Sequence, residues 1–126
     1  MLFKRKIYDK FLAWKTECAG KKALLVEGAR RIGKSTVVEE FAKNEYKSYI
    51  LIDFAKASSD VKEYFQLYLN DLDTFFMLLS VQYGGQLHER DSVIIFDGVQ
   101  LFPKAREAIK YLVADGRYDY METGSL

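Results

Sequence analysis

Short apolar runs alternate with segments of helical periodicity along the chain. The first three runs are continuously apolar, which is typical of strands buried on both faces of a parallel sheet. The fourth run carries polar residues and is a weaker strand prediction. The four predicted strands cover residues 23–26, 49–52, 93–96 and 118–123.

Five helices are expected before and between these strands. Ser58 or Ser59 and Asp71 are suitable N-terminal caps, and Pro103 suits a first helical turn. The paired glycines at 84–85 and Gly116 are expected to end the helices before them. The helices are predicted over residues 8–18, 34–44, 58/59–69, 71–82 and 103–114.

This alternation predicts an α/β fold of three layers with a mostly parallel sheet, formed by one domain over residues 1–126. Ligands of such folds bind beyond the carboxyl ends of the strands. Gly28, Asp53, Asp97 and Thr123 all lie at those ends. We therefore expect them to converge on one site.

The segment after the first strand has the spacing glycine, four residues, glycine, lysine, serine. Gly28 and Gly33 let the backbone turn tightly, so that successive N–H groups point at phosphate oxygens. Lys34 is expected to reach the β- and γ-phosphates, and Ser35 to offer its hydroxyl to Mg²⁺. The helix that begins at Lys34 presents the positive end of its dipole to the anion.

Composition alone gives this pattern in roughly 0.5% of chains of this length, so it favours a phosphate-binding loop for ATP. Arg30 and Arg31 are expected to contact either a phosphate or a neighbouring subunit, or to form a salt bridge, for example with Glu27. The predicted nucleotide-binding residues of this segment are Gly28, Ala29, Arg30, Arg31, Ile32, Gly33, Lys34, Ser35 and Thr36.

A second strand that ends in an acid is needed to hold the magnesium ion of such a site. The third predicted strand ends at Asp97, and Asp97 with Ser35 is the predicted metal pair. Asp53 ends the second strand and is a weaker candidate, for which the sequence favours capping or a surface role.

The residue after Asp97 is Gly98, whereas many P-loop ATPases have a glutamate there that polarises the attacking water. Loss of a general base typically lowers the rate by ~10²–10⁴ but leaves binding intact. Glu27 is a weak catalytic candidate in its place, and Gln100 is another. Structural roles for both remain open.

Composition limits the remaining function classes. The formal net charge is +1, so no global field favours nucleic acid or anionic lipid. Basic residues concentrate before residue 23, which favours a solvated helix face, with a partner or nucleic-acid contact as the alternative. Cys18 is the only cysteine and His88 the only histidine, and no apolar run approaches the ~20 residues of a membrane span. We expect a cytoplasmic protein without a disulfide or a histidine-based metal site.

Three segments together resemble the predicted AAA+-type P-loop ATPases of bacteria and archaea, in which a long C-terminal region follows an AAA-like core. They cover residues 24–36, 94–100 and 123–125. The resemblance implies that Thr123, with Ser125 as an alternative, is the polar sensor near the γ-phosphate. It also implies a fifth strand beside the phosphate-loop strand, so we expect the P-loop fold of this chain to be incomplete at its C-terminal side and its loop strand to lie at the sheet edge.

Three functions remain consistent with the sequence. The first is an ATP-binding module whose hydrolysis is impaired because Gly98 lacks a side chain. The second is an active ATPase in which Glu27 or a partner subunit supplies the catalytic group. The third is a non-enzymatic fragment that acts through protein contacts, including self-association along its open edge.

Overall fold

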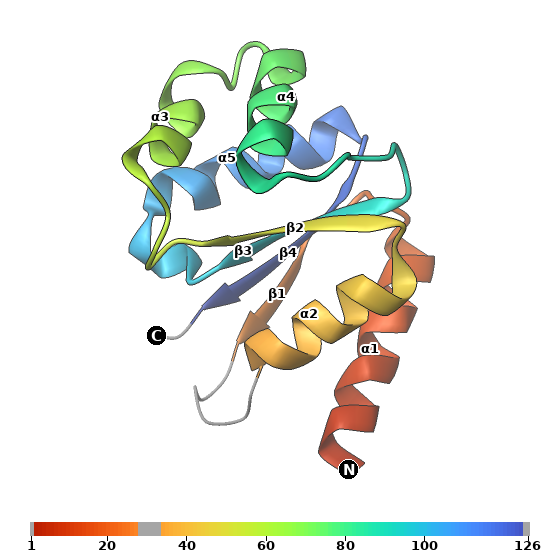
Figure 1. Cartoon of the computed structure of the whole chain (residues 1–126). Helices are drawn as coiled ribbons and strands as arrows, with labels where there is room; N and C mark the ends of the chain where they lie inside the picture. The colour runs from red at the N-terminus through yellow and green to blue at the C-terminus, as the bar shows by residue number, and fades with distance from the viewer. Residues whose placement is uncertain (1, 28–33, 125–126) are drawn as a thin grey trace.

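The predicted alternation of strands and helices folds into a four-stranded sheet between two layers of helices (Figure 1). The computed structural model describes residues 2–27 and 34–124. All neighbouring strands are parallel, in the order β1-β4-β3-β2, which confirms the predicted fold class. The elements are α1 (Leu2–Cys18), β1 (Leu24–Glu27), α2 (Lys34–Glu45), β2 (Ser48–Asp53), α3 (Ser59–Leu67), α4 (Leu72–Tyr83), β3 (Ser92–Asp97), the 3₁₀ turn η2 (Val99–Leu101), α5 (Pro103–Asp115) and β4 (Asp119–Gly124).

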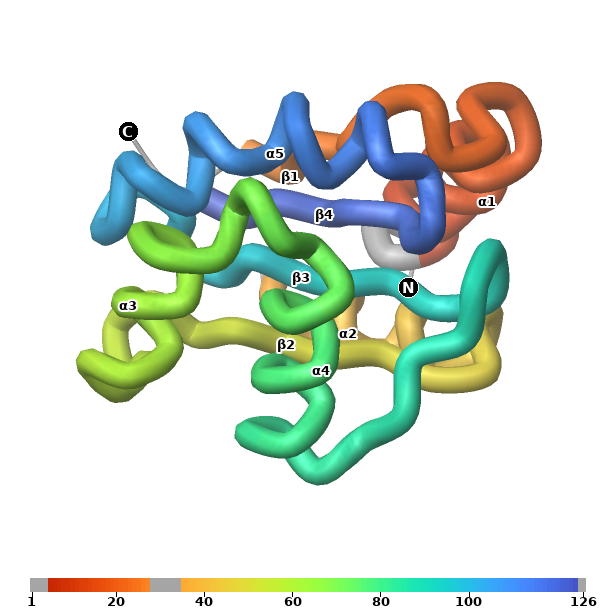
Figure 2. Tube along the Cα trace, turned by 90° about the horizontal axis from the view of Figure 1, so that it is seen from above, coloured from red at the N-terminus to blue at the C-terminus, as the bar shows by residue number. Residues whose placement is uncertain are grey.

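The sheet is covered on both faces (Figures 1 and 2). Helices α1 and α2 lie on one face, and α3, α4 and α5 lie on the other. Side chains of β3 alternate between the two cores: Ile95 packs with Phe41 of α2, and Phe96 packs with Phe65 of α3. This burial on both sides explains why the first strands read as continuous apolar runs.

The sheet register brings the carboxyl ends of the strands together. Asp97 of β3 lies beside Asp53 of β2 on one side and Thr123 of β4 on the other. Glu27, the last residue of β1, lies beside Gly124. The predicted convergence of strand-end residues is therefore present for the described positions.

The helix boundaries follow their caps more closely than their periodicity. Ser58 accepts a hydrogen bond from Val61 N, and Asp71 accepts one from Thr74 N, as expected of N-terminal caps. Helix α3 ends at Leu67, two residues earlier than predicted, because Tyr68 leaves the helical conformation. Helix α1 begins at Leu2, well before the predicted residue 8.

The weakly predicted fourth strand is a central strand of the sheet. It lies between β1 and β3, and its buried residues include the polar Asp119, Glu122 and Thr123. These polar side chains weaken the apolar pattern. Asp119 and Thr123 form hydrogen bonds with other elements, whereas Glu122 is buried with one carboxyl oxygen that has no hydrogen-bond partner among the described residues. The sequence pattern therefore understated this strand.

Candidate functional site: the carboxyl end of the sheet

Three polar side chains from three elements meet at the end of β3. Ser35 Oγ, in the first turn of α2, donates a hydrogen bond to Asp97 Oδ1 at 2.9 Å. The hydroxyl of Thr123 donates a second hydrogen bond to the same oxygen. Asp97 is half-buried and Thr123 is 1% exposed, so the carboxylate is held in place by two hydroxyl donors.

Gly98 shapes the turn that follows Asp97. Its φ of +76° lies in the left-handed region, which an L-residue enters at a cost of about 1–2 kcal/mol. Its N–H contacts both Thr123 Oγ1 at 3.2 Å and the Thr123 carbonyl at 3.0 Å. Gly98 therefore has a backbone role at this turn, which sequence analysis missed because it considered only the absent side chain.

Glu27 and Gln100, the two candidates to replace the missing catalytic carboxylate, lie beside the same residue. Glu27 is exposed and adjacent to Gly124 in the sheet. A Cβ atom added at Gly124 would lie 3.0 Å from Gln100 Oε1, so the Gln100 amide rests over Gly124. Glu27 of β1 and the Gln100 amide thus both lie beside Gly124, the residue that follows Thr123 in β4.

Asp53 has a local role instead of a place in the Asp97 network. Its Oδ1 accepts a hydrogen bond from Ala55 N at 3.0 Å and so stabilises the turn after β2. The neighbouring Phe54 N donates to the Asp97 carbonyl at 2.9 Å, which ties the two strand ends together. This geometry matches the capping interpretation of Asp53.

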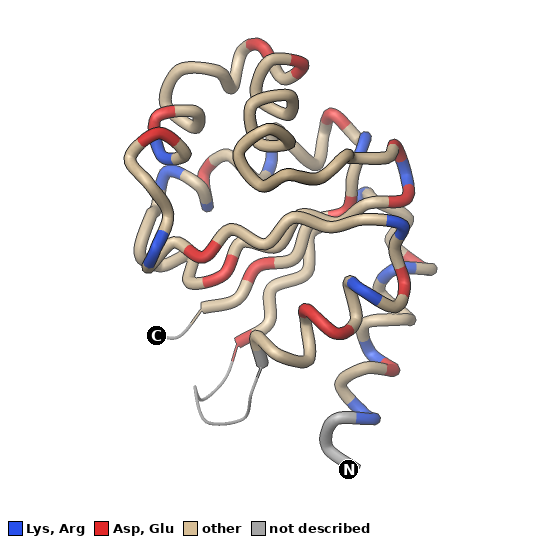
Figure 3. The backbone as a smooth tube through the Cα atoms, viewed as in Figure 1, with Lys and Arg blue, Asp and Glu red and all other residues tan. Residues whose placement is uncertain are grey.

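An acidic residue lies at or near the carboxyl end of every strand, as Figure 3 shows in red. These residues are Glu27, Asp53, Asp97 and Glu122. Carboxylates at this end of the sheet repel the phosphates of a nucleotide unless positive groups intervene. Any phosphate ligand here needs a cation or basic side chains to offset that repulsion.

Glu122 is a buried acid that sequence analysis did not single out. It is 7% exposed, and within the described residues its Oε1 has no hydrogen-bond partner. Burial raises the pKa of Glu122, and the positive charge of Arg106 on α5 counteracts only part of this rise. The available signal was a charged residue inside a strand flanked by buried positions, but the weak pattern of that strand obscured it.

Several predicted residues have limited or no description. Lys34 is the first residue of α2, and Thr36 is exposed in the same turn. Ser125 and the predicted loop residues Gly28, Ala29, Arg30, Arg31, Ile32 and Gly33 lie outside the described residues. Within residues 2–27 and 34–124, no group of three or more His, Cys, Asp or Glu side chains is arranged to hold a metal ion.

The parallel sheet, the glycine-lysine-serine sequence that leads into the first turn of α2 and the acid at the end of β3 define a P-loop nucleotide-binding fold. The family model described as "AAA domain" matches residues 20–126, and the chain belongs to this family. Membership confirms the resemblance to AAA-type ATPases and implies ATP binding at the P-loop. No curated protein matches the sequence. None of the described helices has the length and apolar character needed to cross a membrane.

Proposed function

We propose that this AAA domain binds ATP together with Mg²⁺ and hydrolyses it slowly or not at all. The observation that carries the proposal is the hydrogen-bonded network of Ser35, Asp97 and Thr123. The residue that follows Asp97 is Gly98, where an active site would have a carboxylate side chain. The residues that would hold the phosphates and the metal ion differ from the residue that would activate the attacking water. A site of this composition retains binding when the general base is absent.

The donor set fits magnesium. Mg²⁺ prefers oxygen ligands and usually keeps several waters, with one or two protein oxygens and the phosphates completing its shell. Ser35 would offer its hydroxyl oxygen, and Asp97 its carboxylate, to such an ion. When bound, the ion supplies positive charge against the phosphate oxygens. The acidic strand ends make this compensation necessary, so we expect ATP binding to depend strongly on Mg²⁺.

Impaired hydrolysis follows from the chemistry of residue 98. A glycine has no group that accepts a proton from water, and its left-handed backbone belongs to a tight turn. Loss of a general base typically lowers the rate by ~10²–10⁴. Thr123, which the resemblance implies as the sensor near the γ-phosphate, has its hydroxyl on Asp97 and does not replace a base.

Binding of a fluorescent ATP analogue, with and without Mg²⁺, tests the binding half of the proposal. The wild type should bind in the presence of Mg²⁺, and binding should fall at least tenfold without it. Lys34→Ala should lose binding because the phosphates lose their point charge. Equal binding by wild type and Lys34→Ala would contradict a P-loop site. The exposed Lys43→Ala of α2 serves as the matched control.

One observation supports the alternative of an active ATPase. Glu27 and Gln100 both lie beside Gly124, close to the sensor position. If Glu27 orients the attacking water, Glu27→Gln should lower phosphate release by ~10²-fold or more while nucleotide affinity is retained. Unchanged release in Glu27→Gln would exclude Glu27 as the catalytic group.

A further inference from the structure

The hydroxyl of Thr123 is fully used by hydrogen bonds inside the protein. Its one proton is donated to Asp97 Oδ1, and its oxygen accepts the N–H of Gly98 at 3.2 Å. The side chain lies below the surface, since Thr123 is 1% exposed. A hydroxyl group has a single proton to donate. Thr123 occupies the position that the family resemblance gives to the γ-phosphate sensor, but in this arrangement it has no proton left for a phosphate oxygen.

Gln100 is a second polar side chain at the same end of β4. The left-handed Gly98 turns the chain after β3, and η2 then brings residue 100 back over β4. A Cβ atom at Gly124 would lie 3.0 Å from Gln100 Oε1 and 3.5 Å from Val99 Cγ1. Val99 is fully buried and anchors this turn, whereas Gln100 is exposed. The amide therefore lies over the end of the strand that separates β3 from β1.

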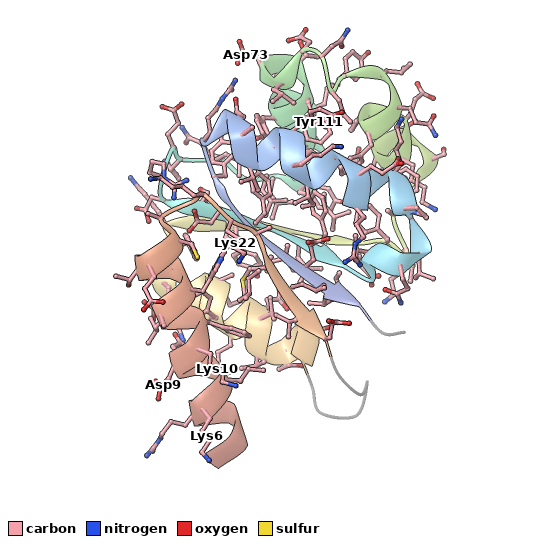
Figure 4. All side chains as sticks on the ribbon, turned by 180° about the vertical axis from the view of Figure 1, so that it is seen from behind. Lys6, Asp9, Lys10, Lys22, Asp73 and Tyr111 are labelled. Carbon is pink, nitrogen blue, oxygen red and sulfur yellow. The ribbon has the colours of Figure 1, made fainter. Side chains whose placement is uncertain are left out.

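The amide of Gln100 is available to a ligand at this end of the sheet, where Figure 4 shows the carboxyl ends of β1 and β4 side by side. Its side chain forms no hydrogen bond with any other residue in the part of the chain that the structure describes. The ionised carboxylates of Glu27, Asp53 and Asp97 can only accept hydrogen bonds, and they repel phosphate. Gln100 thus provides a neutral N–H donor among acids.

We propose that Gln100, and not Thr123, contacts the γ-phosphate and makes the domain prefer ATP over ADP. The inference rests on the proposed nucleotide binding and adds the group that distinguishes the two nucleotides. An N–H group that donates to an anionic phosphate oxygen forms a charge-assisted hydrogen bond, which is stronger than a neutral one. ADP lacks the γ-phosphate and therefore lacks this bond. An amide supplies no general base, so the contact leaves hydrolysis impaired.

Thr123 is a positioning residue that acts through Asp97. Its hydroxyl and that of Ser35 donate to the same carboxylate oxygen. Two donors on one oxygen fix the orientation in which Asp97 faces a magnesium ion. Removal of the Thr123 hydroxyl should loosen the carboxylate for the magnesium complex of either nucleotide. The ratio of the two affinities therefore separates the role of Thr123 from that of Gln100.

Equilibrium titration with the Mg²⁺ complexes of ADP and of a non-hydrolysable ATP analogue tests the proposal. The wild type should bind the ATP analogue about tenfold or more tightly than ADP. Gln100→Ala should remove most of this preference by weakening the ATP analogue alone. Gln100→Glu should weaken the ATP analogue further, because a carboxylate repels the γ-phosphate. Thr123→Val should weaken both nucleotides by similar factors and leave their ratio unchanged.

Gln82→Ala is the matched control, because Gln82 is an exposed glutamine of α4, a helix that contributes no residue to the Ser35–Asp97–Thr123 network. It should bind both nucleotides like the wild type. Circular dichroism of each variant confirms that it is folded. An unchanged affinity ratio in Gln100→Ala would overturn the proposal. A ratio that falls in Thr123→Val and not in Gln100→Ala would overturn it as well, and would make Thr123 the sensor.

The same titrations distinguish failure of this inference from failure of nucleotide binding. If the wild type binds neither nucleotide more tightly than Lys34→Ala does, the proposed function fails and the inference falls with it. If the wild type binds both nucleotides with equal, Lys34-dependent affinity, nucleotide binding stands and the γ-phosphate contact of Gln100 is refuted.

Discussion

At the scale of single residues, the site combines predictable and unpredictable parts. The spacing of the loop predicts Ser35 as a site residue, and the end of an apolar strand predicts Asp97. The structure joins these two side chains by a hydrogen bond. Glu122 differs because its burial depends on β4 being a central strand. A buried carboxyl group with one oxygen that has no hydrogen-bond partner among the described residues has a consequence for stability.

Glu122→Gln should stabilise the protein at neutral pH. Because the pKa of Glu122 is raised in the folded state, its neutral form favours folding, and this contribution is lost as pH rises through the folded-state pKa. The wild type should therefore be less stable than Glu122→Gln near neutral pH, and the difference should disappear below the ordinary glutamate pKa of about 4.3.

Urea unfolding at several pH values measures this difference. Glu107→Gln changes an exposed glutamate of α5 and serves as the control, for which we expect little effect at any pH. A pH-independent difference between wild type and Glu122→Gln would mean that the carboxyl does not titrate between the two states, and the burial argument would fail.

The sequence was informative about a site residue where the residue type alone determines what the residue does. The spacing of Gly28, Gly33 and Lys34 indicated a phosphate loop, and the family match agrees with it. It was less informative where the role of a residue depends on neighbours that are close in space but distant in the sequence. The left-handed turn at Gly98 depends on contact with Thr123, which is distant in sequence but adjacent in the sheet.

At the scale of elements, the turn between β3 and η2 determines what residue 98 contributes. Gly98 has a positive φ, and its single N–H group is shared between two acceptors of Thr123, the hydroxyl oxygen and the carbonyl oxygen. The amino end of the sheet has a comparable connection, in which Tyr46 donates to Asp119 at 2.5 Å and Asp119 pairs with Arg90. Both ends of β4 are thus fixed by side chains from other elements.

Gly98→Ala should lower the free energy of unfolding by about 1–2 kcal/mol, because alanine pays a steric cost in the left-handed region. Gly85→Ala is the matched control, since its φ is not positive and a Cβ atom there meets open space. Chemical denaturation of the two variants measures the difference. Equal effects would mean that the backbone at residue 98 is not constrained as described.

Tyr46→Phe should destabilise the protein by about 1.5–3 kcal/mol, because a buried hydrogen bond to a charged carboxylate is lost. Tyr111→Phe removes the hydroxyl of an exposed tyrosine and should change stability by less than about 0.5 kcal/mol. Thermal or urea unfolding distinguishes these outcomes. A neutral Tyr46→Phe would show that the Tyr46–Asp119 contact adds nothing to stability.

At the scale of the whole molecule, the proposed function assigns nucleotide binding and hydrolysis to different groups at the carboxyl end of the sheet. The hydroxyls of Ser35 and Thr123 hold Asp97, while the position that follows it has no side chain. The sheet order also leaves β1 at an edge of the described fold, which the sequence anticipated from its resemblance to AAA+-type ATPases. The fold therefore retains the framework of a nucleotide site at the carboxyl end of its sheet.

Phosphate release from saturating Mg²⁺–ATP tests most directly whether Gly98 impairs hydrolysis. It is measured for the wild type, Lys34→Ala and Gly98→Glu. We expect no release above the Lys34→Ala background for the wild type, although the wild type binds the nucleotide. We expect a gain in release for Gly98→Glu despite its strained turn. Lys34-dependent release by the wild type, at a rate that Gly98→Glu does not increase, would show that the glycine at position 98 does not limit hydrolysis.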